Sequence, residues 1–514
     1  CGFGDTHPST LRTDIFRYMI QNARTHGKSE EERKFTAMLK LFDPSSSLPV
    51  AERGKAPVAI TSFFAGKPLV LDEKVKAGQI DDYVTPTFYA PNVSWLVQRN
   101  GMNPRHSLMV SLNGSEGNHM HANGISMELY GKGYVLGPDA GIGKTLYQGL
   151  DYLEYYSQFP SHNTVCVDGI SSYPVMKSNH SFKLRALYPA AGERLPYQPI
   201  SYSEVYFREP ETFADQTRLN GIVNVGDSAG YYIDIFRSRK VEGGDKMHDY
   251  FYHNLGQQMT LTAADGSELG LQPTQELAFA GAHLYAYSYI YNKKRAVTSK
   301  DVKAGFTIQM PDKDDITMNL WMKGEEGREI FSALSPMTEG LSRIKNMPYS
   351  IKDQPTLTFV ARQKGEAWNR PFVAVYEPST LKEPSCIASV DYPQVKSEQQ
   401  GSHVGIRVAL TNGNVDWILS SDENAHHCKL EKLQARAGYA LCRQSEKGEA
   451  LQAFLGNGTQ LEADGVSIRT DVPADVLLLK QDGKWMYTAT APCRVVVGKK
   501  KYTLSVSKEL RLLK

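Results

Sequence analysis

Two histidines two positions apart are the residues of this chain best suited to chemistry. His119 and His121 lie in the segment N-H-M-H-A-N-G-I-S, and Asp139 and His162 follow in later segments. Because residues i and i+2 of a β-strand share a face, a strand here would present His119 and His121 together. Two imidazoles and a carboxylate form a common ligand set for Zn²⁺, which takes nitrogen and oxygen donors in a near-tetrahedral site. If His121, Asp139 and His162 hold a metal, His119 stays beside it for proton transfer.

The elements around these residues are predicted to bring them together. The segment M-E-L-Y-G-K-G-Y-V-L-G-P-D predicts a strand, a tight turn at 131–133 and a second strand. Such a hairpin returns Asp139 towards His121. The segment S-H-N-T-V-C-V-D-G alternates as a further strand, with His162 at its start. The alternative interpretation is a set of polar residues on a solvated strand face with no metal.

The order of these motifs resembles a known family. H-x-H-A-(D/N)-x-x-S, a hairpin, P-D-x-G, a tyrosine and x-H-N-T-V-x-V-D-G follow one another as in the C-terminal β-domain of the heparinase II/III-like polysaccharide lyases. The resemblance is tight over 118–170 and weaker over 231–254 and 370–378. Residues 2–7 resemble a segment near the end of that family's α-helical toroid, so we interpret the chain as beginning inside a longer protein.

The resemblance implies catalytic roles. His119 matches the catalytic histidine of the β-domain, and Tyr147, in G-K-T-L-Y, is the best match for its catalytic tyrosine. Tyr155 and Tyr156 are fallback choices because the loop length differs. An ordinary aromatic role for Tyr147 is the alternative, in a chain with 28 tyrosines.

The resemblance also implies a zinc ion held by His121, Asp139 and His162. We expect this zinc to be structural, because it would hold the strand carrying His121 against the strand led by His162 and so fix the direction of His119. Asn123 replaces the more usual aspartate of the family; its carbonyl is still able to accept a hydrogen bond from a ligand imidazole. Asn163 is expected to anchor a turn.

Substrate contacts are predicted on the strands of 231–254 and at the amino-terminal end. Arg239 and His248 are the residues chosen there, with Arg237 on the same strand face as Arg239, because guanidinium groups bind carboxylate or sulfate through paired hydrogen bonds. The alternative is a solvated strand face. His7 is included because the matching toroid segment lies near the cleft. The pair Asn179-His180 is expected in a polar loop.

These roles imply a lyase that cleaves a uronic-acid-containing polysaccharide by β-elimination and leaves a 4,5-unsaturated uronate end. Its partner would be an acidic polysaccharide, and its expected location is the periplasm, the cell surface or the exterior of a bacterium. In proteins of this kind the group that neutralises the carboxylate comes from upstream toroid helices, which this chain lacks. A catalytically silent carbohydrate-binding β-sandwich is the alternative. A zinc hydrolase using Glu128 or Glu154 as base is a third reading.

Composition limits the classes of protein. The chain has 514 residues, 41% of them hydrophobic, and a formal net charge of +2, so no large electrostatic field favours nucleic acid. No apolar run is long enough to span a bilayer. The six cysteines are scattered without a C-x-x-C motif, and we expect them to be buried small side chains.

The pattern along the chain predicts a mainly β protein. Helical spacing over 10–43 predicts a pair of helices, expected as the remnant of an (α/α) toroid, with a helix starting at Ser29. Short alternating runs with Gly, Asn, Asp and Pro between them then predict a large antiparallel sandwich. We predict a helical segment at 1–50, a linker at 51–90, the sandwich at 91–400 and a small β-domain at 401–514.

Overall fold

The structure is a computed structural model that describes residues 13–44, 69–101, 103, 108–143, 150–171, 177–193, 199–226, 228–277, 286–338 and 354–514. Its strands pair antiparallel in every sheet, which confirms the mainly β fold class. The chain forms two compact units, residues 9–85 and residues 86–514 together with 1–8. Each unit is described by itself below, and the predicted boundaries within 91–514 stay predictions.

The smaller unit is built on a helical hairpin, α1 (Asp14–Thr25) and α2 (Ser29–Phe42), followed by a short 3₁₀ turn, η4 (Ile80–Asp82). Gly27, with φ +67°, follows the end of α1, where a left-handed residue closes a helix without a Cβ clash. Phe16, Ile20 and Leu39 form a small core at helical spacing. This confirms the predicted helix pair and its second start at Ser29; residues 10–12 of the predicted range lie outside the described residues.

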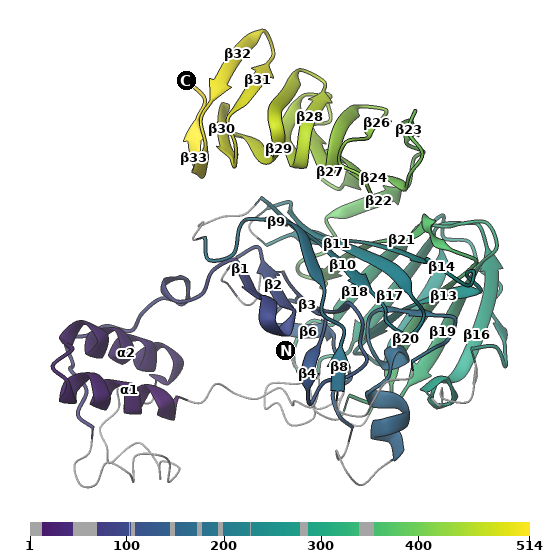
Figure 1. The fold of residues 1–514 in the computed structure, drawn as a ribbon, viewed down its shortest axis with the longest axis horizontal. Coiled ribbons are helices and arrows are strands. Elements are labelled where there is room, and N and C mark those ends of the chain that lie inside the picture. The colour runs from purple at the N-terminus through teal and green to yellow at the C-terminus, as the bar shows by residue number, and fades with distance from the viewer. Residues whose placement is uncertain are drawn as a thin grey trace. The chain divides into compact units, whose positions relative to one another are not determined.

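Two sheets of the larger unit face each other as a sandwich (Figure 1). The first has eight strands in the order β14 (Gln258–Ala263), β17 (Val302–Ile308), β18 (Ile316–Met322), β21 (Ala367–Ser379), β12 (Gly230–Lys240), β11 (Ala214–Asn224), β10 (Ile200–Arg208) and β9 (Lys183–Tyr188). The second has six strands in the order β15 (Gln272–Pro273), β16 (Tyr291–Thr298), β19 (Arg328–Ser335), β20 (Thr356–Lys364), β13 (Met247–Asn254) and β7 (Val165–Val167).

A smaller sheet packs into the same core. It has five strands in the order β1 (Thr87–Ala90), β2 (Trp95–Arg99), β3 (Met109–Asn113), β5 (Ser126–Gly131) and β6 (Tyr134–Gly137). Leu112 and Leu129 of this sheet join Phe236 of the eight-stranded sheet and Phe359 of the six-stranded sheet in one hydrophobic cluster. A separate two-stranded sheet pairs β4 (Glu116–Asn118) with β8 (Lys177–Asn179).

The C-terminal strands form a separate twelve-stranded sheet. Its main path is β22 (Ile387–Asp391), β24 (His403–Leu410), β25 (Val415–Ser421), β27 (Leu433–Gln444), β28 (Ala450–Ala463), β29 (Val466–Gln481), β30 (Lys484–Ala489) and β33 (Ser507–Leu512). The side strands are β23 (Lys396–Ser397), β26 (His427–Leu430), β31 (Cys493–Val497) and β32 (Lys500–Leu504). Ile406, Ile418 and Phe454 of this sheet pack against Ile233 and Ile235 of β12.

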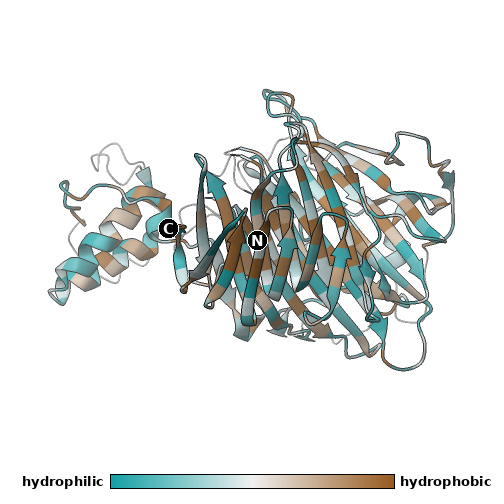
Figure 2. Ribbon diagram, turned by 90° about the horizontal axis from the view of Figure 1, so that it is seen from above, coloured by the Kyte–Doolittle hydropathy of each residue, from teal (hydrophilic) through white to brown (hydrophobic). Residues whose placement is uncertain are grey.

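The eight-stranded sheet is therefore buried on both faces. Along β12, Tyr232 and Phe236 face the sandwich core, whereas Ile233 and Ile235 face the C-terminal sheet. Successive residues of a strand point to opposite faces of the sheet. A strand between two layers therefore carries apolar side chains on both faces. Figure 2 shows this as long brown stretches along the central strands.

The outer face of the six-stranded sheet is covered by irregular chain that includes a π-helix, η6 (Tyr152–Tyr156), and the 3₁₀ turns η7 (Phe159–Ser161) and η8 (Ala286–Tyr289). Tyr155 and Phe159 pack there against Phe251 of β13. A further 3₁₀ turn, η5 (Pro91–Val93), joins β1 to β2. This cover over β13 carries the segment around His162.

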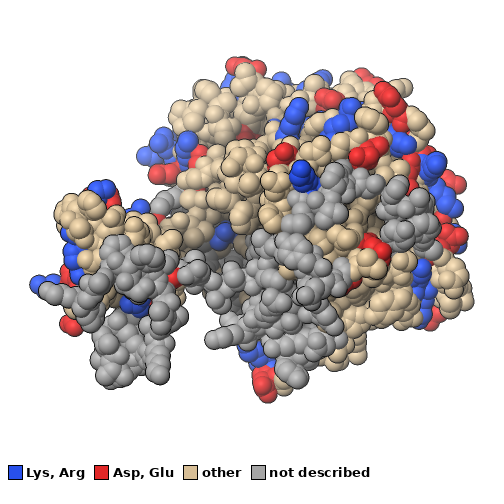
Figure 3. Space-filling model, turned by 60° about the horizontal axis from the view of Figure 1, so that its bottom comes forward, with Lys and Arg blue, Asp and Glu red and all other residues tan. Residues whose placement is uncertain are grey.

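Three observations bear on the composition-based expectations. Cys166, Cys386, Cys428, Cys442 and Cys493 are buried and not joined by disulfides, as expected for small core side chains; Cys1 lies outside the described residues. No described helix is long and apolar enough to cross a membrane. On the face drawn in Figure 3, basic and acidic side chains are interspersed, which agrees with a net charge of +2.

Candidate functional site

His121, Asp139 and His162 gather in the interior of the larger unit. One ligand atom of each lies within 4.8 Å of those of the other two. The three side chains are 1%, 3% and 0% exposed, so the cluster is closed to bulk water. His162 Nδ1 and Asp139 Oδ2 are 2.6 Å apart, and the His121 and His162 rings lie 5.4 Å apart between centroids. Three residues far apart in sequence thus form one buried group of two imidazoles and a carboxylate.

The predicted hairpin positions Asp139. β5 and β6 pair antiparallel, and the turn between them consists of Lys132 and Gly133, both with positive φ (54° and 87°), as a two-residue type I′ loop requires. Asp139 follows two residues after β6 ends at Gly137. His162 comes directly after η7 and three residues before β7 begins at Val165.

The strand expected through His119 and His121 is absent: the described residues 119–125 have no strand conformation. His119 has a φ of +58°, which breaks the extended path between β4 and β5. As a result the two histidines do not share a face, because His119 is exposed whereas His121 is buried. The turn therefore separates an imidazole open to solvent from one held in the cluster.

Asn163 holds three segments of the site together. Its amide nitrogen donates to the carbonyls of Met127 on β5 and Pro138 beside Asp139, at 3.0 and 3.1 Å. Its side-chain oxygen accepts the backbone N–H of His253 on β13 at 2.6 Å. The expected turn anchor is thus a tie between the hairpin, the chain after His162 and the six-stranded sheet.

A buried ion pair between neighbouring strands of the eight-stranded sheet also contacts two segments of the site. Arg218 on β11 donates two hydrogen bonds to the carboxylate of Asp234 on β12, at 2.8 and 2.7 Å. Its remaining terminal nitrogen donates to the carbonyls of Ile125 and Asn163, both at 2.7 Å. Sequence reasoning did not find this pair. The available signal was an arginine and an aspartate inside apolar strands, since charges are rarely buried unless paired.

Glu128 orients Asp139 through the backbone. Its carboxylate accepts the Asp139 N–H at 3.1 Å and the Tyr130 hydroxyl at 2.8 Å. Burial raises the pKa of Glu128. Burial would also raise the pKa of Asp139, but the charge and hydrogen bond of His162, with smaller help from His121 and the Gly141 N–H, leave that pKa below its usual value. Asp139 is therefore favoured as an ionised carboxylate.

The triad fits a zinc ion by its donor chemistry. Zinc accepts imidazole nitrogen and carboxylate oxygen, and an ionised Asp139 supplies the negative charge that a buried cation needs. His162 Nε2 is buried and has no hydrogen-bond partner among the described residues. Asn123 does not act as expected: its amide nitrogen donates to the side chain and carbonyl of Asn113, and its oxygen has no partner in the described part of the chain.

Of the predicted tyrosines, only the fallback choices lie among the described residues, and both are buried. Tyr147 and His7 lie outside the described residues. Tyr155 and Tyr156, the fallback choices, are 1% and 3% exposed, and the Tyr156 hydroxyl donates to the carbonyl of Met337. Burial raises the pKa of Tyr155. Both rings serve the hydrophobic cover of the six-stranded sheet.

Of the residues predicted to contact substrate on β12 and β13, Arg239 is exposed and the others are buried. Arg239 is exposed, with its guanidinium 4.2 Å from the ring centroid of Trp368. Arg237 is not on a solvated strand face as the alternative required: it is 0% exposed and donates to Ser402 and Ser420 of the C-terminal sheet. His248 is also 0% exposed, with its ring nitrogens 2.8 Å from Ser238 Oγ and from Asp245 Oδ1.

His180 is a residue whose place the sequence did not indicate. It was expected in a polar loop, but its ring is 0% exposed and stacks on Phe159. Its Nδ1 accepts the N–H of Gly124, directly after the H-x-H-A-N segment, at 3.2 Å. Burial, with the nearby charge of His162, lowers the pKa of His180 to about 3, so the ring is neutral. The polar composition of residues 177–181 predicted an exposed loop and gave no sign that His180 is buried.

Comparison with known proteins gives one sequence relative. An endo-acting ulvan lyase of Formosa agariphila is 26% identical over 500 residues, which cover 91% of this chain and 58% of the relative. The chain thus spans little more than half the length of that relative. No model of a known protein family matches the sequence.

Solved structures give weaker likenesses. A heparinase III matches 80% of this chain and 49% of its own at 10% identity, with a TM-score of 0.42. The heparan sulfate lyase HepC from Pedobacter heparinus matches 81% and 49% at 12% identity, with a TM-score of 0.39. These scores are too low to carry an argument. The ulvan lyase relative supports the resemblance to the heparinase II/III-like polysaccharide lyases that the ordered motif carries.

Proposed function

We propose that the protein containing these residues is a polysaccharide lyase that cleaves a uronate-containing polymer by β-elimination. The observation that carries the proposal is an exposed imidazole, His119, two residues from a buried His121–Asp139–His162 cluster. The relation to an endo-acting ulvan lyase over 91% of the chain supports the same activity.

The reaction requires three things of an enzyme. The C5 proton beside the uronate carboxylate is weakly acidic, so the carboxylate must be neutralised before a base removes that proton. The oxygen leaving C4 must also be protonated. Positioned acids and bases contribute roughly 10²–10⁴-fold to such steps.

His119 is proposed as one of the proton-transfer groups. It is exposed, so a substrate is able to reach its ring, and its backbone direction is set by the turn that precedes His121. Tyr147 is proposed as the second group from the sequence match. Arg239, which is exposed, is proposed to contact carboxylate or sulfate groups of the polymer.

The zinc ion proposed at the triad would supply structure. Bound by His121, Asp139 and His162, it would join the chain before β5, the chain after β6 and the chain before β7. Because His119 is two residues from His121, fixing His121 on the ion would also restrict the backbone that carries His119. The proton-transfer step itself would need only side chains.

The substrate is proposed to be an acidic polysaccharide met outside the cytoplasm, in the periplasm, at the cell surface or beyond it. Ulvan is the first polymer to test, because the sequence relative is named for it. Heparan sulfate, chondroitin, hyaluronan and alginate complete the panel.

The test is the ultraviolet absorbance of the unsaturated uronate product, measured with the whole natural protein that contains these residues. We expect absorbance to rise with one polymer. For His119→Ala we expect the rate of that rise to be at least about 10²-fold lower. The matched control is His26→Ala, which removes another exposed histidine outside the motif.

Product formation that survives His119→Ala unchanged would refute the catalytic role of His119. Binding of one polymer with no product from any of them would refute the lyase and support a sugar-binding module instead.

A further inference from the structure

A second group of metal-binding side chains lies in the C-terminal sheet. One ligand atom each of His403, Asp422 and His426 lies within 4.8 Å of the others. His403 begins β24, and Asp422 and His426 lie in the turn between β25 and β26. We propose that these three residues bind a second zinc ion, distinct from the ion at the buried triad and independent of the lyase activity.

The spacing of the two imidazoles suits a tetrahedral ion. His403 Nε2 and His426 Nδ1 are 3.2 Å apart, with their rings at 70° to each other. Two nitrogens bound to one tetrahedral zinc at 2.0–2.1 Å stand about 3.3 Å apart. A zinc ion would therefore replace the contact between the two rings with little movement of either.

The carboxylate of Asp422 is held in a fixed direction. The indole N–H of Trp368 donates to Asp422 Oδ2 at 2.7 Å, and the backbone N–H of Ser402 donates to Asp422 Oδ1 at 3.0 Å. Each carboxylate oxygen keeps a further lone pair after these bonds. Such outer hydrogen bonds are what orient the carboxylate ligands of metal sites.

The absence of a side chain at Gly401 leaves room for the proposed ligand atoms of Asp422 and His426. A Cβ added there would stand 2.8 Å from Asp422 Oδ1 and 3.0 Å from His426 Nδ1. A side chain at position 401 would therefore crowd both ligand atoms. This gives a way to disturb the site without removing any ligand.

The second site differs from the first in access and charge. Its three residues are only partly buried, so an ion is able to enter, and three protein ligands leave a fourth position for water. Arg237, hydrogen-bonded to Ser402, interacts electrostatically with Asp422 and opposes a cation. We therefore expect weaker zinc binding here than at the buried triad.

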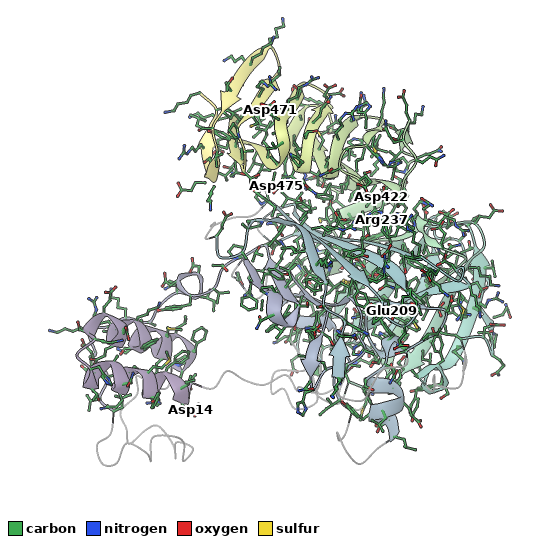
Figure 4. All side chains as sticks on the ribbon, viewed as in Figure 1. Asp14, Glu209, Arg237, Asp422, Asp471 and Asp475 are labelled. Atoms are coloured by element: carbon green, nitrogen blue, oxygen red, sulfur yellow. The ribbon has the colours of Figure 1, made fainter. Side chains whose placement is uncertain are left out.

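The site lies where the C-terminal sheet meets the sandwich. Trp368 belongs to β21 of the sandwich and donates to Asp422 of the C-terminal sheet, close to Arg237 of β12 (Figure 4). Zinc bound to Asp422 would tie the turn between β25 and β26 to β24 at the point where that turn meets Trp368. The ion would thus fix the turn that contacts the sandwich through Trp368.

The experiment counts ions per chain. The full chain is stripped with a chelator, dialysed against Zn²⁺ and analysed by elemental mass spectrometry, and a Co²⁺ titration follows the visible bands of tetrahedral cobalt. We expect two ions for the natural chain and one for His403→Ala or His426→Ala. His121→Ala should also bind one ion, because it loses the other site.

Two further variants separate ligation from general damage. His427→Ala removes the neighbouring imidazole, which lies outside the cluster, and should keep two ions. Gly401→Ala keeps every ligand and should weaken the second ion by at least tenfold. The proposal would be overturned if the His403→Ala, His426→Ala double variant kept as many ions as the natural chain, whether that number is one or two. This result does not depend on whether the protein cleaves a polysaccharide.

Discussion

At the scale of the residue, two neighbouring histidines have opposite surroundings. His119 is exposed at a φ of +58°, whereas His121 is 1% exposed beside Asp139 and His162. A strand would have put both rings on one face; a left-handed turn puts one outside and one inside. Under the proposed function, this separation would let His121 hold a structural ion while His119 meets a substrate.

Zinc removal tests the buried triad. We expect a chelator to lower the melting temperature of the natural chain by several degrees, because an ion that binds only the folded state adds its binding free energy to stability. His162→Ala should melt lower from the outset and respond less to chelator. Differential scanning calorimetry provides the measurement.

The control for zinc removal is His26→Ala, an exposed histidine in the smaller unit. It should keep the full chelator response of the natural chain. If His162→Ala responds to the chelator as strongly as the natural chain does, the buried triad holds no stabilising ion.

At the scale of the element, β11 and β12 carry the charges that the site depends on. Arg218 and Asp234 face each other in the sandwich core, and Arg218 also donates to the carbonyls of Ile125 and Asn163. The pair is 0% and 1% exposed at its side chains. These strands therefore support the loops of the site as well as the core.

Removing one member of this pair should be costly. We expect Arg218→Met to lower the free energy of unfolding by about 3–5 kcal/mol, because it leaves the charge of Asp234 buried without a positive charge beside it. The double variant Arg218→Met, Asp234→Leu should lose less than the sum of the two single changes. Urea unfolding gives these values, and strictly additive losses would show that the two residues do not interact.

At the scale of the whole molecule, local signals in the sequence were sufficient for much of the structure. The helix pair follows from apolar spacing, and the hairpin before Asp139 follows from the Gly-Lys-Gly turn. The cluster of His121, Asp139 and His162 was predicted from the ordered motif over residues 118–170, and the structure brings the three side chains together.

Features that depend on distant contacts were not predictable. The burial of Arg237 requires the C-terminal sheet, whose Ser402 and Ser420 lie far along the chain. The burial of His180 requires Phe159 and Gly124 around it, although its own segment is polar. Both residues have ordinary local sequence, so only the packing of whole layers decides their environment.

His180 makes the free energy of unfolding depend on pH, and the direction of that dependence follows from its pKa. Burial lowers the pKa of His180 from 6.5 to about 3 in the folded chain. Below pH 6.5 the unfolded chain therefore binds a proton that the folded chain does not, and stability falls as the pH falls from 6.5 towards 3. One such group changes the free energy of unfolding by up to about 1.4 kcal/mol per pH unit.

The variant His180→Asn isolates this contribution. Asparagine offers an oxygen to the N–H of Gly124 but takes up no proton in this range, so the variant should lose about 2–3 kcal/mol less than the natural chain between pH 6.5 and 4.5. Urea unfolding at each pH measures the difference, with His26→Asn as the exposed control that should run parallel to the natural chain. If His180→Asn also runs parallel, His180 is not held neutral in the interior of the folded chain.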